Sequence, residues 1–203
     1  MPPEKWDLLL QIGDYYGADS RLDHHYLSVA WASSVVRYIP KALKKVLVIG
    51  ADYDEVKSLE MLGYDATGFG IQDNEYDDIK YVKGDMHNIP FEKREFDAVI
   101  SRGAFEHGHA PWLQALEIRR VLKNGGRLHL DVPKWDDPTL GMYRTDYHHP
   151  MVLHPVQLKR IFHFLGFELV EEEEDIRFWW EKKPVEGIKA GRIRKVIERY
   201  EEL

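Results

Sequence analysis

The amino-acid sequence predicts an α/β fold with a doubly wound parallel sheet, and two observations carry this prediction. Short apolar runs rich in β-branched residues, such as KKVLVIG at 44–50, are typical of strands buried on both faces of a sheet. Amphipathic segments with a helical period lie between such runs, and the first of them ends at Gly63. Because strands and helices alternate, right-handed crossovers would place the strands parallel in one sheet.

The elements are expected in a defined order along the chain. Helical patterns are predicted over 4–12, 24–38, 54–62, 111–123, 154–167 and 186–203. Strands are predicted over 44–50, 65–71, 79–85, 96–101 and 126–133, followed by an antiparallel pair over 167–175 and 176–183. Residues 134–153 break the alternation with a mixture of Trp, Tyr, Met, His, Gly and Pro. A segment of this length and composition inside a compact domain indicates a lid or a substrate-binding loop.

Composition limits the class of protein. The chain has 203 residues, 44% hydrophobic and 31% charged, which is typical of one globular domain spanning 1–203. A formal net charge of −7 argues against a nucleic-acid partner. The lack of cysteine excludes disulfides, thiolate zinc sites and a cysteine nucleophile. No apolar run approaches the ~20 residues that span a bilayer, and the N-terminus lacks a secretory pattern. We therefore expect a cytoplasmic protein that has no membrane partner.

The stretch from 81 to 133 carries a specific set of motifs. It reads YVKGDMHNIPFEKREFDAVISRGAFEHGHAPWLQALEIRRVLKNGGRLHLDVP, and the pattern HP..L…GF follows at 154–167. In these motifs and their spacing, the region 44–172 resembles the class I S-adenosylmethionine-dependent methyltransferases that act on small molecules. The resemblance implies a Rossmann-like seven-stranded sheet with an antiparallel last strand, an N-terminal helical cap at 1–43 and a C-terminal helix. It further implies S-adenosylmethionine as cofactor, S-adenosylhomocysteine as product and a small-molecule acceptor.

The cofactor is expected at the carboxyl ends of the strands. In an open α/β sheet ligands bind there, and the resemblance makes 44–133 the cofactor-binding half and 134–203 the acceptor and lid half. Gly50 would allow close backbone approach, Asp85 would accept a hydrogen bond from the adenine amine, and Ile71 and Met86 would sandwich the ring. The candidate cofactor-binding residues are Gly50, Ala51, Asp52, Gly70, Ile71, Gln72, Asp73, Asp85, Met86, Ser101 and Arg102.

Two positions depart from the family pattern. After the first strand the family has an acidic residue and three spaced glycines, whereas this chain has Val48, Gly50, Asp52 and Asp54. The two aspartates are expected to narrow the space for the cofactor's methionine part. The family's ribose-binding acid aligns with Gly70, and Gln72 or Asp73 would replace it. The departures fit either an enzyme with rearranged cofactor contacts or a non-catalytic binding module. The loop lacks G-x-G-x-x-G, which disfavours a nicotinamide dinucleotide site.

Candidate catalytic residues follow the fourth strand and lie in the 134–153 segment. His107, Tyr147 and His149 are candidates for removing a proton from the acceptor. The alternative for His107 is a role in ordering the loop. Histidines such as His129 and His154 raise the question of a metal site, but their spacing follows no standard ligand pattern, so no metal is expected. His129 is predicted to be packed and hydrogen-bonded instead. The sequence leaves the acceptor's identity and the oligomeric state open.

Overall fold

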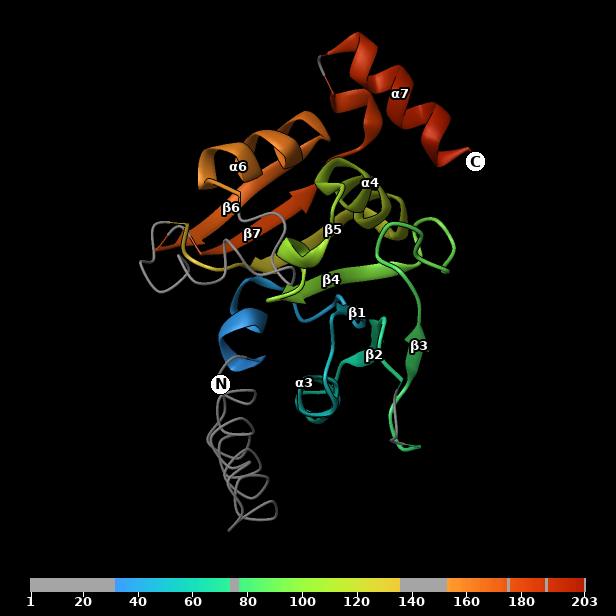
Figure 1. Cartoon of the computed structure of the whole chain (residues 1–203), viewed down its shortest axis with the longest axis vertical. Helices are drawn as coiled ribbons and strands as arrows, with labels where there is room; N and C mark the ends of the chain where they lie inside the picture. Colours follow the sequence, from blue (N-terminus) through green and yellow to red (C-terminus); the bar gives the residue numbers. More distant parts are fainter. Residues whose placement is uncertain (1–31, 74–76, 136–152, 175, 189, 203) are drawn as a thin grey trace.

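A seven-stranded sheet organises the molecule. The computed structural model describes residues 32–73, 77–135, 153–174, 176–188 and 190–202 (Figure 1). The strand order is β3-β2-β1-β4-β5-β7-β6, in which β7 is antiparallel to both neighbours and the other pairs are parallel. This arrangement confirms the predicted fold class. The strands are β1 (Lys45–Ile49), β2 (Asp65–Gly70), β3 (Tyr81–Lys83), β4 (Phe96–Arg102), β5 (Leu122–Asp131), β6 (Phe167–Glu173) and β7 (Arg177–Lys182).

In the described part of the chain, four complete helices and three short 3-10 turns accompany the strands. Residues 32–35 are helical and continue into the first 3-10 turn. No helix in the described ranges is long and apolar enough to cross a membrane. The helices are α3 (Tyr53–Met61), α4 (Pro111–Val121), α6 (Pro155–Phe164) and α7 (Gly191–Glu201), and the 3-10 turns are η1 (Val36–Tyr38), η2 (Phe105–His107) and η3 (Val185–Gly187).

Two predicted boundaries are wrong. The helix expected to reach residue 123 ends at Val121, and β5 begins at once rather than at residue 126. The physical reason is the buried Lys182, whose Nζ donates to the carbonyl oxygens of Arg119 and Leu122 at 2.7 Å each and so satisfies groups at the helix end. The C-terminal helix expected from residue 186 begins at Gly191, because the 3-10 turn η3 precedes it.

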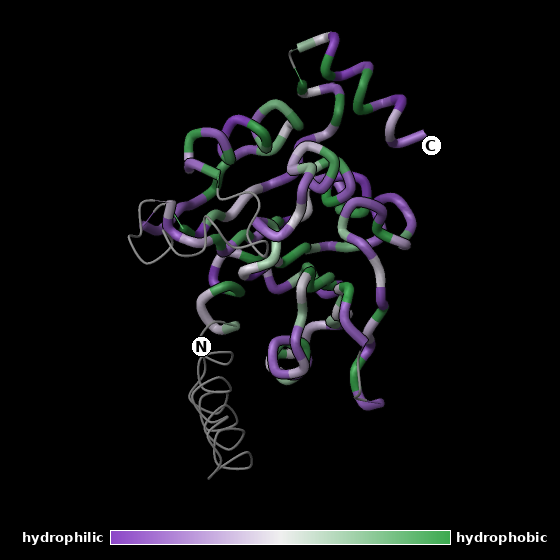
Figure 2. Tube along the Cα trace, viewed as in Figure 1, coloured by the Kyte–Doolittle hydropathy of each residue, from purple (hydrophilic) through white to green (hydrophobic). Residues whose placement is uncertain are grey.

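The alternation of side chains along β1 divides the core into two layers. Leu47 and Ile49 belong to one buried cluster and Val46 and Val48 to the other. Helices α4, α6 and α7 cover the first face, whereas α3 and the segment 32–39 cover the second (Figure 1). Figure 2 shows hydrophobic residues along β4 and an alternation of hydrophilic and hydrophobic residues along α7. The sheet is therefore buried on both sides, as its apolar strands predicted.

Strand β7 connects the C-terminal part of the sheet to the start of the described chain. Trp179 is fully buried, and its indole Nε1 donates to the Val35 carbonyl oxygen at 3.1 Å. The Trp179 ring also packs on Tyr38 and on His129, with ring centroids 4.8 and 4.6 Å apart. His129 is packed as predicted, but the predicted hydrogen bonds are absent, because neither ring nitrogen has a partner among the described residues.

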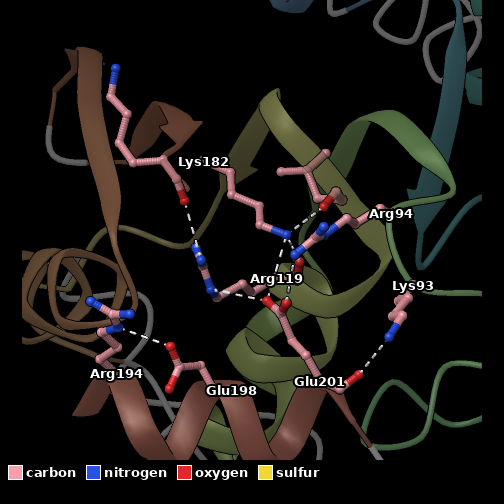
Figure 3. Close-up of polar contacts among 9 residues, drawn as sticks. Lys93, Arg94, Arg119, Lys182, Arg194, Glu198 and Glu201 are labelled. Carbon is pink, nitrogen blue, oxygen red and sulfur yellow. Dashed lines mark hydrogen bonds and ion pairs between the residues drawn. The ribbon is translucent and has the colours of Figure 1, made fainter. Parts of the chain in front are cut away.

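A group of charged side chains attaches α7 to the body of the molecule (Figure 3). Glu201 Oε1 lies 3.4 Å from Arg119 Nε and 3.7 Å from Lys182 Nζ, and Glu201 Oε2 lies 3.4 Å from Arg94 Nη2. Arg119 and Lys182 are almost fully buried. One carboxylate on α7 therefore faces two buried cations contributed by α4 and β7.

Candidate functional site

The loop after β1 passes close to the end of β4. Gly50 has φ +72°, and a Cβ added to it would lie 2.3 Å from Ala104 Cβ. Its N–H donates to the Phe69 carbonyl oxygen at 2.7 Å. A larger residue at position 50 would be strained by the positive φ and would overlap Ala104. Glycine at this position thus leaves bare backbone at the carboxyl edge of the sheet, where the sequence placed the cofactor.

The acidic residues that replace the family's later glycines begin α3. Asp52 is the N-cap residue, and its Oδ1 accepts the Glu55 N–H at 2.9 Å. Glu55 Oε2 accepts the Asp52 N–H at 3.3 Å, which completes a capping box. Asp54 lies in the first turn, where negative charge is favourable at a helix N-terminus. The Asp52 carboxylate therefore accepts a hydrogen bond from the helix backbone. The sequence predicted only that Asp52 would narrow the space for the cofactor, and this capping role was not predicted.

Arg102 at the end of β4 forms an ion pair across the sheet edge. Its Nη1 lies 3.3 Å from Oε1 of Glu55, whose side chain is 5% exposed. Burial and, to a smaller extent, the neighbouring Asp52 carboxylate raise the pKa of Glu55 to about 8, against the opposing effect of the Arg102 guanidinium. Sequence reasoning chose Arg102 but missed Glu55. The only signal was the Asp-x-x-Glu spacing of the capping box.

The end of β2 differs from the family in the way that the sequence indicated. A Cβ on Gly70 would lie 2.8 Å from the Tyr81 hydroxyl oxygen, so Tyr81 takes the space of a longer side chain. In the loop that follows Gly70, Ile71 is 69% exposed, and Asp73 Oδ1 forms an ion pair with Lys83 Nζ at 2.8 Å. Gln72 is likewise exposed. Sequence reasoning missed Tyr81, because a tyrosine at the start of a strand carries no functional pattern of its own.

Asp85 after β3 is held in place by a histidine two residues later. Its Oδ1 accepts the His87 backbone N–H at 2.8 Å and lies 2.6 Å from His87 Nδ1. These hydrogen bonds lower the pKa of Asp85, with the backbone N–H as the largest cause. The Asp85 side chain is 65% exposed, whereas Met86 packs against the larger core cluster. His87 was also missed by sequence reasoning, although the Asp-x-His spacing was present.

The turn after β4 places its two ionisable residues differently. Glu106 is buried, and burial raises its pKa to about 7, with the Asp131 carboxylate acting in the same direction. His107 is exposed on the same 3-10 turn.

The ends of β4 and β5 carry two further polar residues. Ser101 is buried at the end of β4, and its hydroxyl has no hydrogen-bond partner among the described residues. Asp131 closes β5 with its Oδ2 3.6 Å from Arg177 Nε.

Several predicted residues are not brought together in the described part of the chain. Tyr147 and His149, the 134–153 loop beyond residue 135 and the N-terminal helices before residue 32 lie outside it. His154 caps α6, where its Nδ1 accepts the Val156 N–H at 3.1 Å. Within the described ranges no three His, Asp or Glu side chains are grouped as metal ligands.

Two hollows lie away from the carboxyl edge, between α6 and β6. Their volumes are about 480 and 530 Å³, and they share the lining residues His163, Phe164, Phe167 and Leu169. None of the predicted cofactor-binding residues lines either hollow. The candidate site is therefore the edge formed by the loops that follow β1 to β4.

Comparison with known sequences points to one family. Residues 33–130 match the model of a family described as a methyltransferase domain. The chain is 31% identical over 136 residues to a demethylmenaquinone methyltransferase of Thermotoga maritima, a match that covers 62% of this chain and 55% of that protein. The chain is also 37% identical over 57 residues to an uncharacterised 37.1 kDa protein in a transposon of Streptomyces fradiae. This match covers 28% of this chain and 16% of that protein. The chain thus spans about half of the first relative and less of the second.

Solved structures share the architecture. An S-adenosylmethionine-dependent methyltransferase of Thermotoga maritima has a TM-score of 0.63 at 13% identity, with coverage of 89% of this chain and 99% of that one. Another from Archaeoglobus fulgidus has a TM-score of 0.60 at 23% identity, with coverage of 88% and 87%. At these identities the likeness establishes the fold. Sheet order, sequence motifs and the matched domain agree: residues 33–130 match a methyltransferase domain, and the chain has the fold of the class I S-adenosylmethionine-dependent methyltransferases.

Proposed function

We propose that the protein binds S-adenosylmethionine across the carboxyl ends of β1, β2 and β3 and transfers its methyl group to a small molecule. The observation that carries this proposal is the loop after β1. Gly50 presents bare backbone beside Ala104, and the Asp52 carboxylate is engaged at the start of α3. A nucleoside ligand at a sheet edge needs this close backbone approach. The bound cofactor supplies an activated methyl group, and the chain's residues orient the acceptor and exclude water.

The proposed adenine subsite lies after β3, next to the loop after β2. Asp85 carries an exposed carboxylate whose orientation is fixed by His87, which suits it to accept a hydrogen bond from an exocyclic amine. Met86 and Ile71 would contact the ring. Ala51, Gly70, Gln72, Asp73, Ser101 and Arg102 complete the proposed cofactor site.

The acceptor is proposed to lie between the two halves of the chain, 44–133 and 134–203. His107 is exposed on the turn after β4, and with Tyr147 and His149 it is proposed to take a proton from the acceptor. A relative named for the methylation of demethylmenaquinone supports a small-molecule acceptor, and the net charge of −7 gives no support for nucleic acid.

A second candidate function is a non-catalytic binding module with weakened cofactor affinity. One observation favours it. The Tyr81 hydroxyl takes the space at Gly70 where the family places its ribose-binding acid. This candidate predicts weak or absent binding of S-adenosylmethionine, whereas the enzyme predicts clear binding. One titration therefore separates the two.

The test is calorimetric titration of the purified protein with S-adenosylmethionine. We expect saturable binding, and we expect Asp85→Asn to weaken it about 10- to 100-fold, the range for one lost hydrogen bond to a charged acceptor. Asp78→Asn is the matched control, because Asp78 is an exposed acid that pairs with Lys57 of α3. A flat titration of folded protein at millimolar ligand would exclude the proposed function. An equal response of the two variants would exclude the adenine subsite at Asp85.

A further inference from the structure

Glu106 has an unusual environment for a carboxyl group. The residue is 3% exposed, and its Oε2 has no hydrogen-bond partner among the described residues. A buried polar atom without a partner is costly, and most such atoms in folded proteins are paired. The orphaned oxygen therefore requires an explanation beyond the packing of η2.

The position of Glu106 places it beside the loop after β1. Ala104, two residues earlier, is the residue that a Cβ on Gly50 would meet. Gly103 is exposed, and its N–H donates to the Asp131 carbonyl oxygen at 2.9 Å. Glu106 Oε1 lies 3.7 Å from the point that a Cβ on Gly103 would take. The carboxyl group is therefore close to the exposed Gly103, which follows β4 at the same edge of the sheet as Gly50.

The charged groups around Glu106 leave it without a cation. Asp131 at the end of β5 has the same charge sign, and Arg177 of β7 pairs with Asp131 at 3.6 Å. Arg102 at the end of β4 contacts Glu55 of α3 at 3.3 Å, and its charge, like that of Arg177, acts on Asp131. In the described ranges no lysine or arginine forms an ion pair with Glu106. A cationic ligand at this edge would therefore meet an acid whose charge is not already balanced.

We propose that Glu106 provides the negative charge opposite the sulfonium of S-adenosylmethionine, and that binding of this cation releases the Glu106 proton. The inference rests on the proposed function. S-adenosylhomocysteine lacks the sulfonium charge, so Glu106 distinguishes the cofactor from the product. Loss of the cation on methyl transfer lets Glu106 take up a proton again and weakens the retention of the product.

The proton linkage has a definite sign and size. Burial and Asp131 raise the pKa of Glu106 to about 7, so the free protein holds its proton below neutral pH. A cation bound nearby favours the carboxylate and lowers this pKa. Binding of S-adenosylmethionine should therefore release up to one proton, and its affinity should rise by about tenfold between pH 6 and 8. The affinity for S-adenosylhomocysteine should change little over the same range.

The experiment compares the two ligands by calorimetry at pH 6, 7 and 8. Repeating the pH 7 titration in two buffers of different ionisation enthalpy counts the protons released. We expect proton release with S-adenosylmethionine only. Glu106→Gln should abolish this release and level the pH profile, whereas Glu106→Asp should retain a ligand-specific profile.

Glu55→Gln is the matched control, because Glu55 is the other buried acid at this edge with a raised pKa. The difference between the two ligands should persist in that variant. A level ratio of the two affinities in the wild-type protein, or equal proton release with both ligands, would overturn the inference and leave the proposed function intact. Binding of neither ligand would overturn the proposed function and this inference with it. The wild-type comparison decides even where a variant fails to fold.

Discussion

At the scale of single residues, Gly50 lets the loop after β1 pass close to Ala104 at the end of β4. A side chain at position 50 would destabilise the fold in two ways. The backbone has a φ of +72°, and an added Cβ would lie 2.3 Å from Ala104 Cβ. The first effect costs about 1–2 kcal/mol for a non-glycine residue. The second forces the turn after β4 to move, and with it the start of η2.

We expect Gly50→Ala to lower the free energy of unfolding by about 3–4 kcal/mol, because strain and overlap add. Gly125→Ala is the control, since Gly125 has φ +75° but no atom within 4 Å of an added Cβ. It should lose only about 1–2 kcal/mol from backbone strain. Urea denaturation of both variants measures the difference. Equal decreases in the free energy of unfolding of the two variants would show that Ala104 moves away from the added Cβ without a measurable loss of stability.

His129 offers a test of pH dependence at a single buried ring. Burial lowers the pKa of His129 to about 3, and the charge of Arg177 acts in the same direction. The unfolded chain binds this proton near pH 6.5, so the contribution of neutral His129 to stability is present above pH 6.5 and is lost as the pH falls. At pH 5 the loss is about 2 kcal/mol.

His129→Leu should remove this acid sensitivity. The ring makes no hydrogen bond with the described residues, so an apolar side chain of similar size should cost less than about 1 kcal/mol at pH 7. Denaturation at pH 7 and pH 5 should then show a smaller difference for the variant than for the wild-type protein. A large loss at pH 7 would reveal a polar contact that His129 needs.

Residues at the site were only partly predictable. Gly50 and Asp85 were predicted as site residues from strand ends and motif spacing, and the structure places them after β1 and β3, at the carboxyl edge of the sheet. Glu55 and Glu106 were missed as buried acids, because burial depends on what packs over a side chain and not on its neighbours in sequence. Tyr81 was missed for a related reason, as it fills space left by a glycine on the adjacent strand.

At the scale of elements, one carboxylate of α7 faces two buried cations. Ile197 and Ile193 pack on the core, and the Tyr200 hydroxyl donates to Glu117 Oε1 at 2.8 Å. Glu201 adds contacts with the buried cations Arg119 and Lys182 (Figure 3). Burial lowers the pKa of Lys182 to about 8, against the opposing effect of Glu201. Removal of one partner from a buried ion pair leaves the other charge uncompensated.

Glu201→Gln should therefore destabilise the protein by about 3 kcal/mol at pH 7. Glu198→Gln, one turn earlier, removes an exposed pair with Arg194 and should cost less than about 0.5 kcal/mol. The deficit of Glu201→Gln should shrink at pH 9, where Lys182 gives up its proton. Urea denaturation at both pH values checks this, and matching losses in the two variants would contradict the assigned role.

Element boundaries were the part of the fold that sequence patterns predicted least well. Asn124-Gly125-Gly126 indicates a helix end, yet α4 ends at Val121 because a lysine distant in sequence satisfies its last carbonyl groups. The start of α7 shifted for a local reason, since Pro184 is followed by a 3-10 turn. Long-range contacts of this kind leave no periodic signal in the sequence.

At the scale of the whole molecule, the sheet and its two-sided burial followed from the order of apolar runs. Fully apolar strands indicate helices on both faces, and the position of an antiparallel β7 came from the family resemblance. Strand order was not deducible from periodicity alone. The acceptor side of the site is proposed to include 134–153, most of which lies outside the described residues.

The insertion of β7 between β5 and β6 has a consequence for biosynthesis. During translation β1 to β4 emerge early and can pair, but β5 keeps an open edge until residues 177–182 leave the ribosome. The indole of Trp179 then reaches back 144 positions to the Val35 carbonyl. Contacts of such high sequence separation form slowly, so a nascent chain stalled before residue 177 would present an unpaired apolar edge to chaperones and proteases.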